Sequence, residues 1–338
     1  MTKKHLSEYA VNLFSSSFFI LPADQVTSDN VMREEHVEPT KKCHIYVICK
    51  RPSIRFKKES IKYIEDTITG SIEYKIDGKL ITKSFKKTYP SKNKNITVEV
   101  SKYPHREIVI HSNDGEEDAF FPSSIFDFHV DNKEDLKELK KLEVLYIGQS
   151  YANGKRSALD RLKSHSTLQK ILAECNKNHP DDEVFILTFQ YEPYRIISIL
   201  NGNITGIKPS QKDIEQDDIR YKSIRKTPLK KKQQICLAEA GLIRYFQPIY
   251  NKIYKDNFPS NKQKILEKCY KLDFCALAIE INTDELEIQL FSDTAPAKFH
   301  HIGNFDLHDK NDRMSFFTIN RFGKNASLAP SPISPSGK

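Results

Sequence analysis

The sequence predicts an α/β (α+β) protein whose middle third mixes strands with helices and is flanked by two β-rich segments. Twenty Phe and 15 Tyr among 338 residues supply enough large side chains for a packed core, which excludes global disorder. Short runs of β-branched and aromatic residues predict strands on both sides of the middle third. These runs cover residues 44–49, 71–76, 96–100, 107–111, 276–281, 286–291 and 315–319.

The chain divides by composition into three segments and a tail. Residues 1–122 form an N-terminal accessory domain that opens with an expected helix over residues 6–19. Within it, Asp77-Gly78 predicts a hairpin turn. Residues 123–260 form the central domain and residues 271–319 a C-terminal β-rich segment. The tail, residues 320–338, is rich in Pro, Ser and Gly and is expected to be disordered.

The sequence of the central domain predicts alternating strands and helices. Residues 143–148 predict a buried strand, and a helix is expected from Ser157. Ser166-x-x-Gln169 is a capping box that predicts a second helix through about residue 177. A strand over residues 183–191 and a helix over residues 229–246 complete the domain.

Several classes of protein are excluded by what the sequence lacks. No apolar run is long enough for a membrane-spanning helix. The six cysteines include no C-x-x-C pair, so neither a zinc site nor a disulfide scaffold is expected, and a reducing cytoplasm fits best. No Gly-x4-Gly-Lys-Ser/Thr loop is present, which argues against nucleotide hydrolysis.

Positive charge is concentrated near the end of the central domain. Residues 221–255 contain nine basic residues and one acidic residue, so this window carries a net +8, the same as the whole chain. A concentrated positive zone suits a phosphate polymer, because binding releases condensed counterions. A solvated lysine-rich loop explains the same composition.

Glu239 lies at an unusual position in the expected helix over residues 229–246. Ile235, Glu239, Leu242 and Phe246 are spaced by four, three and four residues, which places a carboxylate on the stripe that faces the core. A buried carboxylate needs a partner. A buried Arg and a hard divalent cation are the two candidates.

Two further groups have both ordinary and functional interpretations. Arg161 and His165 are four residues apart, hence on one helix face, where they form either an exposed basic face or a phosphate grip with a proton donor. Tyr146 lies next to Gly148 at a strand end. It is either an ordinary sheet aromatic or a phenol that holds or deprotonates a water molecule.

The order of these groups is informative. Tyr146-Ile147-Gly148, Arg161-x-x-x-His165, Glu239 and Asn251 resemble, in this order, the GIY-YIG endonuclease family. Residues 239–251, E-A-G-L-I-R-Y-F-Q-P-I-Y-N, are especially similar to the nuclease half of the bacterial excision-repair endonuclease of this family. The resemblance covers residues 123–260.

The resemblance implies a three-stranded antiparallel sheet with flanking helices and one divalent metal ion, Mg²⁺ or Mn²⁺. It assigns the metal to Glu239 and the scissile phosphate to Arg161. Tyr146 would position or activate the attacking water, His165 would assist at the phosphate or in proton transfer, and Asn251 would fix the backbone near the metal.

The chain departs from the family pattern in its first motif. No G-I-Y occurs, and the hairpin strand that precedes Y-I-G is expected at residues 125–130. That strand offers Phe128 or His129 where the family has a tyrosine, so His129 is a candidate general base.

We therefore expect a cytoplasmic, metal-dependent endonuclease that cuts DNA in phage defence or restriction, a mobile element or repair, with RNA as an alternative substrate. The accessory segments would select a target or a protein partner. A catalytically inactive nucleic-acid-binding protein and a purely structural protein are the alternatives. The basic side chains expected to contact nucleic acid are Lys155, Arg156, Arg225, Lys226, Lys230, Lys231, Lys232 and Lys252.

Overall fold

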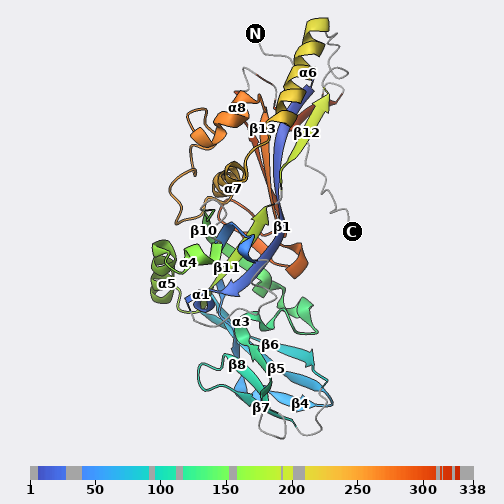
Figure 1. The fold of residues 1–338 in the computed structure, drawn as a ribbon. Helices are drawn as coiled ribbons and strands as arrows, with labels where there is room; N and C mark the ends of the chain where they lie inside the picture. The colour runs from blue at the N-terminus through green and yellow to red at the C-terminus, as the bar shows by residue number, and fades with distance from the viewer. Residues whose placement is uncertain are drawn as a thin grey trace.

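The computed structural model describes residues 7–27, 40–90, 96–111, 117–151, 158–191, 193–200, 210–309, 313, 315–321 and 324–327. It is a mixed α+β structure in which strands predominate. The molecule is elongated, with a large sheet through its upper and middle parts and smaller sheets at its lower end (Figure 1). None of the helices in the described ranges combines the length and the apolar character that crossing a membrane requires.

An eight-stranded sheet organises the molecule, in the order β14-β10-β2-β11-β1-β13-β15, with β12 also paired to β1. Strands β10, β2 and β11 are neighbours and antiparallel. Strand β1 joins the two halves of the sheet, because its end pairs with β11 and its beginning with β12 and β13. The strands are β1 (Ser7–Pro22), β2 (Ile45–Pro52), β10 (Lys141–Gln149), β11 (Asp182–Tyr191), β12 (Arg195–Leu200), β13 (Ala276–Asn282), β14 (Gln289–Phe291) and β15 (His300–Asp306).

Helices cover both faces of the β10-β2-β11 region. Alternate residues of β2 point to opposite faces, so Ile45 and Val47 join the core that contains α7 (Lys231–Phe246). Tyr46 and Ile48 instead join a second core with α4 (Ala158–Leu162) and α5 (Ser166–Asn178). The remaining α-helices described are α1 (Asp24–Thr27), α3 (Ser123–Phe126), α6 (Gln211–Lys226) and α8 (Glu267–Lys271).

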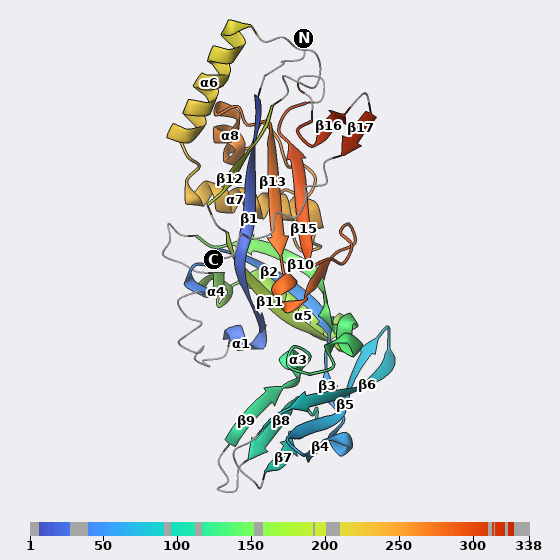
Figure 2. The ribbon, with the colours of Figure 1, turned by 90° about the vertical axis from the view of Figure 1, so that its right-hand side faces the viewer.

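A separate β-rich unit is inserted between β2 and β10, two strands that pair with each other in the main sheet. The insert spans residues 53–140, has its own hydrophobic core and lies at one end of the molecule (Figure 2). Strands β3, β5, β4 and β6 form one of its sheets and β7, β8 and β9 the other. Their bounds are β3 (Arg55–Phe56), β4 (Lys62–Ile64), β5 (Thr67–Ile76), β6 (Lys79–Thr88), β7 (Thr97–Val100), β8 (Glu107–His111) and β9 (Glu117–Pro122).

Several predicted elements are confirmed. The Asp77-Gly78 turn joins β5 to β6, with Ile76 paired to Lys79. The predicted strands over residues 44–49, 107–111, 143–148 and 183–191 correspond to β2, β8, β10 and β11. The predicted helix over residues 229–246 is α7. The helix expected from the capping box is α5, although its N-cap is His165 rather than Ser166.

The predicted helix over residues 6–19 is wrong, because residues 7–19 lie in strand β1. The segment is rich in aromatic residues, which pack well on a pleated surface. Its backbone is hydrogen-bonded to β11, β12 and β13. Pairing along both edges therefore overrides the helical spacing of its apolar residues.

The strand expected over residues 125–130 is also wrong. Residues 123–126 form α3 and a turn follows through His129. The cause is local, since Asp127 is fully buried and its carboxylate receives two hydrogen bonds from the Arg51 guanidinium, each 2.9 Å long. This ion pair holds the segment as a compact turn against β2.

The structure divides the chain differently from the predicted domains. Strands β1 and β2 of the predicted first domain belong to the main sheet, and the described residues between 53 and 140 form a separate unit. Strands β13–β15 of the predicted C-terminal segment extend the same main sheet. In the predicted disordered tail, β16 (Thr318–Arg321) pairs with β17 (Lys324–Ser327), and residues 328–338 lie outside the described residues.

Candidate active site

Two tyrosines from adjacent strands meet at the centre of the candidate site. Tyr46 of β2 is opposite Gly148 of β10, and Tyr146 is opposite Ile48. Tyr46 and Tyr146 therefore lie on the same face, with ring centroids 6.2 Å apart. Tyr46 is almost completely buried, whereas Tyr146 is half-buried and open to solvent on one side.

His165 connects this pair to α5. Its Nδ1 accepts a hydrogen bond of 3.2 Å from the backbone N–H of Leu168, so the side chain caps the helix. Its Nε2 lies 3.1 Å from the hydroxyl of Tyr46. Burial and the nearby Arg161 lower the pKa of His165, so the neutral ring predominates at neutral pH. Because Nδ1 is an acceptor, the ring proton is assigned to Nε2, which donates to Tyr46.

The Tyr46 hydroxyl has several polar neighbours. Its oxygen receives a hydrogen bond from His165, and Tyr146, Glu239 and Arg161 are close enough to affect its pKa. Burial strongly raises the pKa of Tyr46. Burial also raises the pKa of Tyr146, but there the hydrogen bond from Tyr46 opposes the shift. Tyr146 is thus the phenol better placed to exchange a proton with solvent or substrate.

Glu239 supplies the negative side of the site. It lies on α7 and is half-buried. Burial raises the pKa of its carboxyl from 4.5 to about 7, and the backbone N–H of Gln149 at the end of β10 opposes the shift with a hydrogen bond. Glu239 adds to the effect of burial in raising the pKa of both Tyr46 and Tyr146. The carboxylate therefore acts electrostatically on the phenol pair.

Arg161 supplies the positive side. It lies in the last turn of α4, and its side chain is exposed. The charge of Arg161 lowers the pKa of Tyr46 and of Tyr146. Burial and the charge of Glu239 both raise the pKa of these two phenols. Among the described residues, no carboxylate lies within 4.0 Å of the Arg161 guanidinium, and no cationic side chain lies within 4.0 Å of the Glu239 carboxylate. The sequence left a buried Arg and a divalent cation as possible partners of Glu239. Among the described residues, no Arg forms an ion pair with it.

Asn251 holds the strand that carries Tyr146. Its side-chain oxygen accepts from the backbone N–H of Ile147 at 2.9 Å, and its side-chain amide donates to the Ile147 carbonyl at 2.8 Å. The neighbouring Tyr250 N–H also donates to the carbonyl of Leu145. Residues 250 and 251 thus take the place of a partner strand along this edge of β10. The side chain of Asn251 therefore acts on the backbone of β10.

Three side chains that the sequence did not single out also face the site. Tyr46 is the first of them, and its neighbours His44 and Ile45 give the run H-I-Y. Tyr254 and Cys236 are the others, because burial raises the pKa of each and Glu239 adds to the shift. The pattern I-Y inside a buried strand was the available signal for Tyr46. It was missed because the insert separates Tyr46 from Tyr146 by about a hundred residues.

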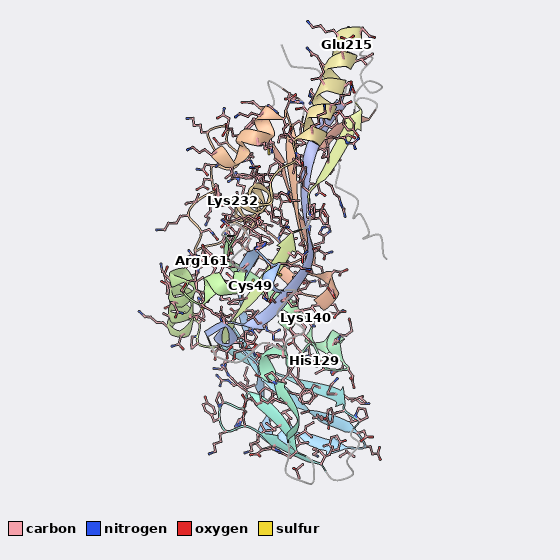
Figure 3. The ribbon with its side chains drawn as sticks, in the orientation of Figure 1. Cys49, His129, Lys140, Arg161, Glu215 and Lys232 are labelled. Atoms are coloured by element: carbon pink, nitrogen blue, oxygen red, sulfur yellow. The ribbon has the colours of Figure 1, made fainter. Side chains whose placement is uncertain are left out.

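His129 does not lie at the site, which corrects its expected place as a general base. Its side chain is exposed in the turn that follows α3. The charged groups that act on it all belong to the insert, and they are Lys87, Asp127, Lys133 and Lys140. Figure 3 shows His129 well separated from Arg161. The turn that buries Asp127 is the reason for this placement.

The predicted nucleic-acid contacts are only partly near the site. Lys232 lies on α7 within electrostatic reach of Cys236, on the same side of the molecule as Arg161 (Figure 3), and the exposed Lys252 follows Asn251 directly. Arg225 and Lys226 end α6, which projects at the opposite end of the molecule from the insert (Figure 1). Lys230 lies at the N-cap of α7 and Lys231 donates to the Tyr191 carbonyl. Lys155 and Arg156 lie outside the described residues.

The donor set suits a loosely held divalent cation. Across the described ranges, no three His, Cys, Asp or Glu side chains converge on one point. A single half-buried carboxylate fits Mg²⁺, which keeps most of its water ligands and completes its shell with substrate phosphate. Glu239 is the side chain that would hold the ion.

Comparisons of the chain with protein-family models, curated proteins and solved structures found no match. The geometry of the site therefore carries the functional conclusion.

Proposed function

We propose that this protein is a metal-dependent endonuclease that hydrolyses phosphodiester bonds in DNA on a GIY-YIG-like core. The core would consist of the antiparallel strands β10-β2-β11 with α4, α5 and α7 around them. In this proposal H-I-Y of β2 takes the place of G-I-Y, and Tyr146-Ile147-Gly148 of β10 pairs with it. The core is split in sequence by the insert.

The observation that carries the proposal is the position of the two phenols. The Arg161 guanidinium and the Glu239 carboxyl are both within electrostatic reach of Tyr46 and Tyr146, and burial raises the pKa of Glu239 to about 7. Neither charge has an ion-pair partner among the described residues. A phosphodiester in this position would meet a cationic group at its oxygens and a phenol beside its attacking water. Groups preorganised around developing charge stabilise the transition state more than the ground state.

Each side chain has a role in this proposal. Arg161 grips the scissile phosphate, and the oxygen of the neutral Tyr146 phenol accepts a hydrogen bond from the attacking water and orients it. The proton of the water passes to a non-bridging oxygen of the phosphate, and His165 keeps Tyr46 oriented beside Tyr146. A Mg²⁺ or Mn²⁺ ion at Glu239 would neutralise charge on the phosphate oxygens and on the departing alkoxide.

The proposal favours a cutting enzyme over an inactive DNA-binding protein. The inactive alternative rests on the missing first tyrosine, and Tyr46 supplies a phenol in that position. The proposal also gives the insert a place, because it enters between two core strands and leaves their pairing intact.

Cleavage assays with matched variants test the proposal. Purified protein should nick or linearise plasmid DNA in Mg²⁺ or Mn²⁺ and should be inactive in EDTA. Arg161→Ala and Glu239→Gln should each reduce the rate at least about 100-fold, while Lys163→Ala and Glu215→Gln, exposed residues of the same charge types, should retain it. A wild-type protein that binds DNA but cuts neither plasmid nor oligonucleotide would support the inactive alternative instead.

A further inference from the structure

The insert presents an aromatic side chain directly to solvent. Tyr103, in the loop between β7 and β8, is 77% exposed, the highest fraction among the large hydrophobic side chains in the described part of the chain. Exposing a ring to this extent forgoes the free energy of burying it. An exposed aromatic ring of this kind offers a face on which a nucleic-acid base can stack.

The loop that carries Tyr103 is firmly held. The backbone N–H of Ser101 donates to the Glu107 carbonyl, and the backbone N–H of Glu107 donates to the Ser101 hydroxyl. The His105 carbonyl accepts from the backbone N–H of Phe56, a buried residue of the insert core. His105 itself has a φ of +62°, a left-handed conformation that a non-glycine residue keeps only when its surroundings enforce it. The ring therefore projects from a preorganised loop.

A cationic side chain lies against the exposed ring. The Arg55 guanidinium lies 5.8 Å from the Tyr103 ring centroid and donates to its hydroxyl at 3.5 Å. Neither Arg55 nor Lys102, the residue before Tyr103, has a carboxylate within 4.0 Å among the described residues. Both cations can therefore bind phosphates next to a base that stacks on the ring.

The insert and the candidate active site are connected by α5. Arg106 and Phe120 of the insert line a cleft of about 500 Å³ together with Leu172 and Cys175 of α5. The opposite end of α5 is capped by His165 of the candidate site. A helix of this length spans about 20 Å. The helix therefore links the phenol pair to the insert, and a DNA strand would pass outside the cleft, whose lining includes Asp24, Glu107, Asp182 and Glu183.

We propose that Tyr103 is a stacking platform for an unpaired base of a DNA substrate, with Arg55 and Lys102 binding the adjacent phosphates. A duplex base has no free face, so the platform selects DNA with single-stranded character. This inference rests on the proposed function and deepens it by naming the class of substrate. The insert thereby becomes the part of the protein that recognises DNA structure.

Binding measurements in EDTA test the platform without cleavage. Fluorescence anisotropy would compare a single strand of about 30 nucleotides with the matching duplex. Tyr103→Ala should weaken binding of the single strand about tenfold, the loss of one base stack, and should change duplex affinity less than about twofold. Tyr103→Phe should bind like wild type. Ile64→Ala, a truncation of another exposed apolar residue of the insert, should also bind like wild type.

The cations have a separate signature. Arg55→Ala and Lys102→Ala should each flatten the slope of log K against log salt by about 0.7 for single-stranded DNA, the effect of losing one phosphate contact, while Tyr103→Ala should leave that slope unchanged. Equal single-strand affinity for wild type and Tyr103→Ala would overturn the platform, and so would an equal loss on duplex DNA. Either result leaves cleavage by the wild-type protein intact, so the platform can fail while the proposed endonuclease stands. Absence of cleavage with Tyr103-dependent binding would show the reverse.

Discussion

Gly148 lies directly beneath the phenol of Tyr46. A Cβ atom built on Gly148 would be 2.5 Å from both Cζ and Oη of Tyr46, and 2.9 Å from the ring of Tyr146. Such separations are impossible for a real side chain, so only glycine lets the two rings occupy these positions. The glycine of the Y-I-G motif therefore has a steric role, which is to admit the partner strand's tyrosine.

Gly148→Ala should displace the Tyr46 ring and break its contacts with His165 and Tyr146. Overpacking of a buried site costs about 1–3 kcal/mol of stability, and cleavage should fall to the level of Tyr46→Ala. Gly70→Ala is the matched control, because its Cβ would meet Ile61 at 2.5 Å, against the hydrophobic core of the insert and away from that of Tyr46. It should lower the unfolding temperature comparably but retain activity per folded molecule. Equal activity of both variants would contradict the steric role of Gly148.

His165 has two functions that substitutions can separate. His165→Ala removes both the cap of α5 and the donor to Tyr46, and should cost about 1 kcal/mol of stability from the cap. His165→Asn supplies a capping oxygen without the imidazole, so it should restore stability but not cleavage. Thermal unfolding and plasmid cleavage measure the two effects. Recovery of cleavage by His165→Asn would show that the ring acts only as a cap.

The pairing of strands that are neighbours in the sequence could be predicted, whereas the pairing of strands far apart in the sequence could not. Asp77-Gly78 specified the β5–β6 hairpin because the turn and both strands are local. The helical spacing of residues 6–19 gave no indication that this segment pairs with β11, β12 and β13, which lie far along the chain. Strand β2 was predicted as a strand, but its pairing with β10 was hidden by the insert. Tertiary contacts decided these elements.

For the candidate site too, local sequence patterns predicted some side chains and missed those that long-range contacts place. Glu239 was found because helical periodicity placed a carboxylate on an apolar stripe, and Arg161 and His165 because they are four residues apart. Tyr46 was missed because the expected hairpin directed attention to residues 125–130. No local pattern distinguishes His129 of a surface turn from a site histidine. The deciding contact, which joins residues 51 and 127, spans 76 residues.

The ionisation of Glu239 predicts a pH dependence of stability. Its pKa is about 7 in the folded protein and 4.5 in its ordinary environment, so the folded state binds more protons between these values. The contribution of this group to stability is then fully present below about pH 4.5 and is lost as the pH rises through 7, by on the order of 2–3 kcal/mol. Glu239→Gln removes this decline. The variant should therefore unfold at a higher temperature than wild type at pH 8 and at nearly the same temperature at pH 5.

A divalent cation that binds Glu239 should offset the loss of stability that the ionised carboxylate causes at high pH. Mg²⁺ at pH 8 should raise the unfolding temperature of wild type, since it binds the folded state, but should not raise that of Glu239→Gln. Glu285→Gln, at an exposed position, is the control and should respond to Mg²⁺ like wild type. If Glu239→Gln were less stable than wild type at pH 8, the carboxylate would have a cationic partner other than a metal ion.

Asn251 should matter through the backbone of β10. Asn251→Ala leaves the N–H and the carbonyl of Ile147 without their partners, which should cost about 2 kcal/mol. Cleavage should fall as well, because Tyr146 and Gly148 flank Ile147. Asn251→Asp keeps an acceptor but loses the donor, so it should not rescue the strand. Urea unfolding and cleavage measure both effects. Lys252→Ala, at the next and exposed position, should leave stability unchanged.

The joint between the insert and the main sheet depends on the pair Arg51–Asp127. Both side chains are almost fully buried, and Arg51 also lies 3.4 Å from Glu183. Asp127→Ala leaves the guanidinium with that single carboxylate, and should destabilise the protein by about 3 kcal/mol in urea. Burial raises the pKa of Glu183 to about 7 and the charge of Asp127 adds to this, so that pKa should fall in the variant. Glu134→Ala, in the exposed part of the same segment, is the control and should leave stability unchanged. If Asp127→Ala were as stable as wild type, the insert would be held by its apolar contacts alone.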